Sequence, residues 1–105
     1  MVKSRRSKAS AIDFNTYSTV IERDNHSCII CSINFNLHCH HYIPRSQGGL
    51  GIPNNLVMLC NCCHNAIHTG NKTINLKKYV HNYLKHQYGE FNIEDLKYNK
   101  YKKEC

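Results

Sequence analysis

The sequence predicts a small α+β domain, and three observations lead to that prediction. The chain has 105 residues, so we expect one domain, residues 1–105, with a hydrophobic core of marginal size. Helical apolar patterns lie towards both ends of the chain, and two short extended segments lie between them. Seven cysteines offer a way to staple such a core, by disulfides or by a metal ion.

The N-terminal part combines a basic segment with a predicted helix. Residues 1–10 carry basic side chains among small polar ones, which is typical of a flexible arm (Lys3, Arg5, Arg6 and Lys8). Asp13 favours an N-cap position, and apolar residues recur after it at helical spacing (Phe14, Tyr17, Val20 and Ile21). We therefore expect an amphipathic helix from about Phe14 to Arg23.

The middle of the chain reads as two extended segments joined by a loop. The first runs from Phe35 to Ile43 and ends at Pro44. The loop from Arg45 to Pro53 contains three glycines, and Leu56 to Leu59 is an apolar run long enough for one strand.

Three further helices are expected after the second extended segment. The first covers Cys60 to His68, with Gly70 as its C′ residue. The second covers Ile74 to Gln87, where apolar residues form a clear stripe (Leu76, Tyr79, Val80, Tyr83 and Leu84). A short third helix is expected from Phe91 to Tyr101, so the C-terminal helices occupy residues 74–101.

Four of the cysteines form two C-x2-C pairs. Cys28 and Cys31 precede the first extended segment, and Cys60 and Cys63 follow the second. Two such turns supply the four thiolates of a closed tetrahedral zinc site. The alternatives are unrelated buried cysteines, a disulfide within each turn, or a ligand pair that uses Cys62. We expect a structural zinc ion whose binding energy stabilises the fold.

The charge of the chain indicates a polyanionic partner. Lys and Arg number 14 against 7 Asp and Glu, which gives a formal charge of +7. Nucleic acid is the commonest partner of such a protein, although a solvated basic surface is the simpler reading. The N-terminus MVKSRRSKAS has no apolar leader, and no apolar run has membrane-spanning length. We therefore expect no membrane partner and a reducing, cytoplasmic location.

Histidines form a second constellation around the loop. His40 and His41 end the first extended segment, and His64 and His68 lie four apart on the predicted helix. Residues four apart share one helix face, so His64 and His68 can bind one cation. His40 can supply a third nitrogen if the extended segment packs against this helix, as the shared zinc site requires.

The stretch HHYIPRSQGGLGIPNNLVMLCNCCHNAIH resembles the motif of the HNH endonucleases. That motif reads Asp/His-His, a Pro and Gly-Gly loop, Asn-Leu, and then C-x2-C-H at the start of a helix. With the flanking C-x2-C pairs, the resemblance covers Cys28 to His68. It implies a zinc-stapled ββα-metal core within residues 28–70, flanked by N- and C-terminal helices. His40 and the H-x3-H spacing resemble the bacterial-toxin DNases, whereas the zinc knuckles resemble phage and restriction enzymes.

The resemblance also implies roles for individual residues. His41 is expected to be the general base. His40 stands where many members have Asp, and with His64 and His68 it would hold the catalytic cation. Asn55 would position the end of the histidine-bearing strand through hydrogen bonds to its backbone.

Elementary chemistry agrees with these roles. Neutral imidazole, with a pKa near ~6.5, can accept a proton from water at neutral pH. A divalent cation held by three neutral nitrogens keeps its full charge and has open positions for phosphate oxygens. Three nitrogen ligands suit Zn, Ni, Co or Mn better than Mg, which prefers oxygen.

The favoured function is a metal-dependent DNA endonuclease that leaves a 3′-hydroxyl and a 5′-phosphate, as the family does. The alternatives are a zinc-stabilised DNA-binding module that does not cut and an interaction protein whose histidines bind a metal for assembly. Cleavage of both strands would need a homodimer or two visits. The Asn- and Lys-rich composition suggests a phage or mobile element, and restriction is one setting that uses such cores. Basic residues expected to contact DNA are Arg5, Arg6, Arg45, Lys72, Lys77 and Lys78.

Overall fold

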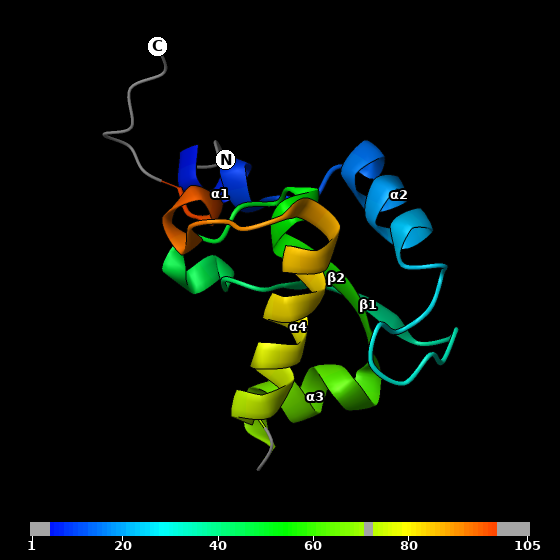
Figure 1. The fold of residues 1–105 in the computed structure, drawn as a ribbon. Coiled ribbons are helices and arrows are strands. Elements are labelled where there is room, and N and C mark those ends of the chain that lie inside the picture. The colour runs from blue at the N-terminus through cyan, green and yellow to red at the C-terminus, as the bar shows by residue number, and fades with distance from the viewer. Residues whose placement is uncertain (1–4, 71–72, 99–105) are drawn as a thin grey trace.

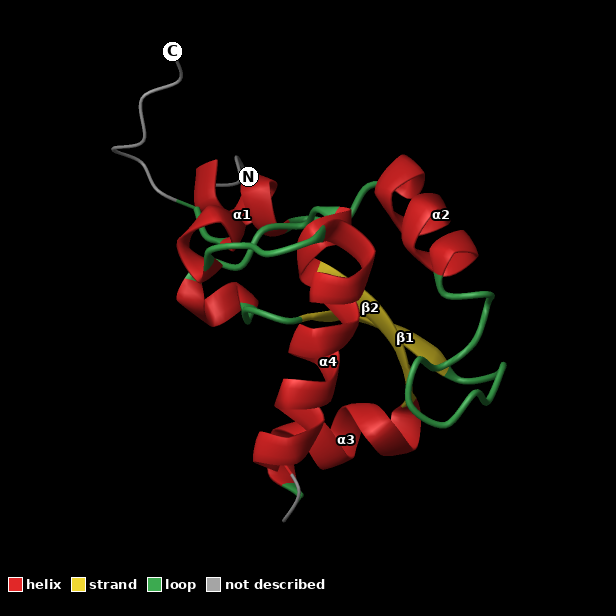
Figure 2. Cartoon of the chain, viewed as in Figure 1, coloured by secondary structure: helices red, strands yellow, loops and turns green. Residues whose placement is uncertain are grey.

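The computed structural model describes residues 5–70 and 73–98, with side chains from Lys8 onward. It is a small α+β fold, as predicted, in which two strands lie among four helices (Figures 1 and 2). The elements are α1 (Arg5–Ser10), α2 (Phe14–Arg23), β1 (Leu37–His41), β2 (Leu56–Cys60), α3 (Asn61–Thr69) and α4 (Thr73–Tyr88). Short 3₁₀ turns occupy Arg45–Gln47, Pro53–Asn55 and Ile93–Leu96.

The two strands form an antiparallel pair at the centre of the fold. Leu37 of β1 lies opposite Cys60 of β2, and His41 lies opposite Leu56. All five residues of β2 are buried, because helices cover both of its faces. Leu56 and Met58 pack against Val20 of α2. Val57 and Leu59 belong to the other cluster, which α3 and α4 complete with Ile67, Val80 and Leu84.

Helix α2 has the predicted bounds and the predicted cap. The Asp13 carboxylate accepts a hydrogen bond from the Thr16 amide at 2.7 Å, which satisfies one of the free amides of the first turn. At the other end, buried Asp24 accepts from the Met58 amide at 2.9 Å, and Arg23 donates to the Leu56 carbonyl at 2.7 Å. These bonds attach the end of α2 to β2.

Asn55 shapes the loop that connects β1 to β2. Its side chain is fully buried and bonds both backbone groups of Ile43, accepting from the amide at 2.8 Å and donating to the carbonyl at 3.2 Å. It also donates to the Leu50 carbonyl at 2.9 Å. Gly49 packs so closely against the Ile43 carbonyl that a Cβ would lie 1.6 Å from its oxygen. The chain just after β1 is therefore held from both sides.

Two elements differ from the sequence predictions. Where a flexible arm was predicted over residues 1–10, Arg5–Ser10 forms a helix, while residues 1–4 lie outside the described part. Ser10 is buried, and the Ala9 carbonyl accepts from the Gly51 amide at 2.9 Å, so this segment packs onto the loop.

The predicted helix from Phe91 to Tyr101 is wrong over its described residues. Only a 3₁₀ turn forms at Ile93–Leu96, and Lys97 then pairs with Gly49 as an isolated bridge. The Leu50 amide donates to the Leu96 carbonyl at 2.8 Å. Pairing with the loop satisfies the backbone groups that a helix would have bonded internally.

Candidate active site

The predicted cysteine pairs come together at the junction of β2 and α3. The sulfurs of Cys28, Cys31, Cys60 and Cys63 all lie within 4.8 Å of one another. The sulfurs of Cys31 and Cys60 are 3.4 Å apart, and Cys60 caps α3 by accepting from the Cys63 amide. Cys62 is exposed and does not belong to this cluster, so the alternative pair of Cys60 and Cys62 is not the one formed.

This donor set fits a structural zinc ion. Zinc bonds four thiolates at about 2.3 Å in a tetrahedron, which places the sulfurs about 3.8 Å apart. The sulfur separations here span that value. Burial alone would raise the pKa of the Cys28 thiol, but hydrogen bonds from the backbone of Cys31, Cys60 and Ile30 lower it to about 7. This favours the thiolate at Cys28, whereas the neighbouring thiols raise the pKa of Cys31 and burial raises that of Cys63 in the absence of a cation.

Three of the predicted histidines form a second cluster. Ligand nitrogens of His40, His64 and His68 all lie within 4.8 Å of one another. The Nε2 atoms of His64 and His68 are 3.3 Å apart. Two nitrogens that share one ion at 2.0–2.1 Å are separated by roughly 3–3.4 Å, so this distance suits a shared cation. The structure therefore brings together the three side chains that the sequence analysis grouped.

Helix α3 contributes to both clusters. Cys60 and Cys63 stand at its N-terminus, and His64 and His68 lie one turn apart on a neighbouring face. Adjacent residues of a helix point about 100° apart, so Cys63 faces the thiol cluster while His64 faces β1. The cysteines hold the start of α3 against the hairpin, and this fixes the distance from His64 to His40.

His40 is in the protonation state that a metal ligand needs. It is buried, with 5% of its surface exposed. Burial, together with the neighbouring His64 and His68, lowers the pKa of His40 to about 3. The imidazole is therefore neutral across the physiological range, with a lone pair available for a cation.

His41 lies in the same cavity but outside the histidine cluster. The cavity has a volume of about 250 Å³, and its walls include His40, His41, Arg45, His64 and His68. The Nε2 atom of His41 is 2.9 Å from the Ser10 carbonyl oxygen. A carbonyl can only accept, so Nε2 carries the proton and Nδ1 keeps its lone pair. Burial lowers the pKa of His41, which also favours the neutral ring.

Neighbouring residues of a strand point to opposite faces, so His40 and His41 can line one cavity only where the strand ends. β1 ends at His41, and the chain then turns into the loop held by Asn55. Asn55 bonds the backbone of Ile43, two residues beyond His41, and its side chain does not line the cavity.

The predicted DNA-contacting residues are only partly described. Arg45 is exposed at the rim of the cavity, and Lys77 and Lys78 are exposed on α4. Lys77 is near enough to His40 to contribute to its lowered pKa. Lys72 and the side chains of Arg5 and Arg6 lie outside the described residues.

Two contributors to the site have no role predicted from the sequence. His38 stacks on His64 with ring centroids 5.1 Å apart. Its place two residues before His40, on the same strand face, was the available signal. The Ser10 carbonyl had no signal, since a backbone atom leaves no residue-type pattern.

No helix within the described residues combines the length and hydrophobicity needed to cross a bilayer.

Comparison with known proteins agrees with this geometry. The family model described as HNH endonuclease matches residues 28–70, the segment that holds both clusters. Anaredoxin from Nostoc sp. (strain PCC 7120 / SAG 25.82 / UTEX 2576) is 32% identical over 57 residues, which cover 53% of this chain and 75% of that protein. Paired cysteine knuckles, a strand-end histidine pair and a helix carrying H-x3-H meet in that matched segment. The chain belongs to the HNH endonuclease family.

Proposed function

We propose that this protein is a metal-dependent DNA endonuclease in which His41 is the general base. One observation carries the proposal. Three imidazoles converge closely enough to share a cation, and a fourth, His41, lines the same cavity with its Nδ1 lone pair free. A plain structural metal site has no use for this fourth ring.

Each residue of the site has a distinct role in phosphodiester hydrolysis. His41 Nδ1 accepts the proton of the attacking water, and the Ser10 carbonyl holds the ring in the required tautomer. His40, His64 and His68 hold a divalent cation, which when bound stabilises negative charge on the phosphate and the leaving oxygen. Arg45 at the rim of the cavity binds a neighbouring phosphate oxygen.

The charge of the chain supports DNA as the substrate. The formal charge is +7; Arg45 lines the histidine cavity, and Lys77, next to Lys78 on α4, is close enough to His40 to affect its pKa. Contacts of this kind neutralise phosphates and carry little sequence information.

One active site cuts one strand, so we expect nicking by a single copy of the chain and double-strand cleavage only through two copies.

The ligand set also supports a metal preference. Three neutral nitrogens favour Zn, Ni, Co or Mn over Mg. Activity greatest in Mg by a wide margin would show that the three histidines are not the ligands.

The test is cleavage of supercoiled plasmid in the presence of Mn, Mg, Ni or Zn. We expect His41→Ala to reduce the rate by about 10²-fold or more, since a general base contributes roughly 10²–10⁴-fold. The matched control is His86→Ala, which removes an exposed histidine of α4 outside the cavity. Zinc content and far-UV circular dichroism are measured for each variant.

The outcomes separate the candidate functions. Equal cleavage by parent and His41→Ala would remove His41 from the role of base. No cleavage by either, combined with DNA binding that weakens steeply with salt, would favour the DNA-binding module. Neither cleavage nor binding would favour the metal-assembled interaction protein.

A further inference from the structure

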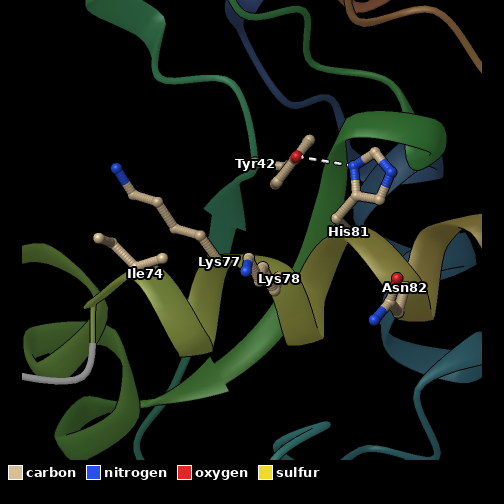
Figure 3. Close-up of a pocket in the computed structure, with 6 residues that line it drawn as sticks. All are labelled: Tyr42, Ile74, Lys77, Lys78, His81 and Asn82. Atoms are coloured by element: carbon tan, nitrogen blue, oxygen red, sulfur yellow. Dashed lines mark hydrogen bonds between the residues drawn. The ribbon is translucent and has the colours of Figure 1, made fainter.

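A second cavity opens beside the histidine cavity, between the end of β1 and helix α4. Its volume is about 490 Å³, which is within the range of roughly 300–1,000 Å³ typical of small-molecule sites. It is lined by Tyr42, Ile74, Lys77, Lys78, His81 and Asn82. Figure 3 shows that five of these come from successive turns of α4 and that Tyr42 faces them from the strand side.

One wall of this cavity is fixed by aromatic contacts. The Tyr42 hydroxyl lies 2.8 Å from His81 Nδ1, the bond drawn in Figure 3. Phe91 packs behind both rings, with centroids 4.8 Å from His81 and 6.3 Å from Tyr42. Tyr42 and His81 thus form an aromatic wall, and Ile74, 71% exposed, adds an apolar group at the other end.

The remaining lining is cationic and polar. Lys77 and Lys78 are both exposed, and none of the six lining residues is acidic. In Figure 3 the Lys77 side chain extends along the cavity towards Ile74. Ammonium groups next to aromatic and apolar surface are the combination that binds a nucleotide, with the phosphate on the cations and the base stacked on the rings.

The position of the cavity relates it to the proposed catalytic site. Tyr42 directly follows His41, and consecutive Cα atoms are about 3.8 Å apart. Lys77 influences His40 electrostatically from the same helix that forms the cavity floor. These two links bring the Tyr42 and Lys77 walls of the cavity near the histidine cluster, so the next nucleotide of a strand bound at that cluster can reach the cavity.

We propose that this cavity binds the nucleotide adjacent to the scissile phosphate. Its backbone phosphate lies against Lys77 and Lys78, and its base lies against Tyr42 and Ile74. The position next to the scissile phosphate rests on the proposed nuclease function, whereas nucleotide binding does not.

The test is a titration of the full, zinc-loaded chain with thymidine 3′,5′-bisphosphate. Binding is measured from the NMR chemical shifts of the backbone amides. We expect shifts at Tyr42 and along residues 74–82, larger than those around His64 and His68. Lys78→Ala should weaken binding at least fivefold. Lys85→Ala should change it less than twofold, because Lys85 is on the same helix but outside the cavity and paired with Glu90. Both variants lower the net charge by one.

Two further experiments test whether the nucleotide base is bound and whether the cavity lies next to the scissile phosphate. Inorganic phosphate should bind at least fivefold more weakly than the bisphosphate, and Ile74→Ala should reduce that difference. In the plasmid assay Lys78→Ala should lower kcat/KM at least fivefold relative to Lys85→Ala. Equal losses in the two lysine variants, or shifts confined to α3, would overturn the proposal while leaving the nuclease intact. Binding in the cavity by a chain that cuts no DNA would instead refute the proposed function and retain the nucleotide site.

Discussion

The cysteine cluster and the histidine cluster share helix α3, yet they are built for different tasks. The first gathers four thiols where the knuckle of Cys28 and Cys31 meets the end of β2, and this number completes a tetrahedron. The second gathers three imidazoles beside a cavity of about 250 Å³ that also contains His41 and Arg45. Four thiolates would close the coordination of a zinc ion, whereas a cation held by three imidazoles would keep open positions.

The difference shows how a small domain can support a reactive site. A closed four-thiolate site contributes folding energy, which a 105-residue chain with a small core needs. We therefore expect the fold not to depend on the three-histidine site, which can then remain open. Fixing Cys60 and Cys63 at the start of α3 also sets the spacing of His64 and His68 against His40.

The contrast between a structural cysteine cluster and a functional histidine cluster can be tested by substitution. The largest effect is expected from Cys60→Ser. Structural zinc in small domains contributes about 10–16 kcal/mol of apparent binding energy, which is comparable to or larger than the total stability of a typical domain, about 5–15 kcal/mol. Weakening that site should abolish the folded state, read as loss of near-UV circular dichroism and of bound zinc. Cys60 also caps α3, which adds to the effect.

The control for this prediction is Cys62→Ser, two positions along the chain. Cys62 is exposed and lies outside the cluster, so this variant should keep its zinc and its fold. A stable fold in Cys60→Ser with zinc absent would show that zinc bound by the cysteine cluster does not stabilise the fold.

A smaller, functional effect is expected from His68→Ala. His68 is an exposed member of the histidine cluster, so its loss should leave the fold and the zinc in place. Cleavage should fall at least ~100-fold, because even outer-shell partners of a metal typically contribute 10–100-fold. Metal analysis should find the zinc retained and the affinity for a second ion, Mn or Ni, reduced. Unfolding of this variant would instead mean that both clusters are structural.

Much of this arrangement could be predicted from the sequence, because its signals are local. Asp13 and the apolar spacing after it define α2, and the continuous apolar run from Leu56 defines a strand buried on both faces. The spacing of Cys60, Cys63, His64 and His68 on one helix follows directly from helical geometry.

The parts that could not be predicted depend on backbone atoms and long-range pairing. Residues after Phe91 have a helical pattern, but pairing of Lys97 with Gly49 prevails over it. The hydrogen bond from His41 to Ser10 uses a carbonyl that any residue would supply, so no residue type marks it. The cavity on α4 likewise depends on where Tyr42 and Phe91 meet that helix, which the helical pattern does not specify.

The smallest effect that we predict tests whether the N-terminal segment affects cleavage only by orienting His41. A Cβ on Gly51 would lie 2.1 Å from the Ala11 carbonyl oxygen and 2.9 Å from that of Ser10. Gly51→Ala should therefore displace the carbonyl that orients His41, and cleavage should fall about tenfold, a fraction of the contribution of a general base. Overpacking should also cost about 1–3 kcal/mol of stability, read from urea unfolding.

A double-mutant cycle separates orientation of His41 from general damage to the fold. If Gly51 acts through His41, Gly51→Ala should lower cleavage in the parent and cause little further loss in His41→Ala, because the ring it misplaces is already absent. Zinc and second-metal content should be unchanged in both backgrounds. Equal tenfold losses with and without His41 would mean that the substitution disturbs the histidine cluster itself. The N-terminal segment would then support the whole fold. The arrangement of the histidine cluster would depend on that segment as well as on α3.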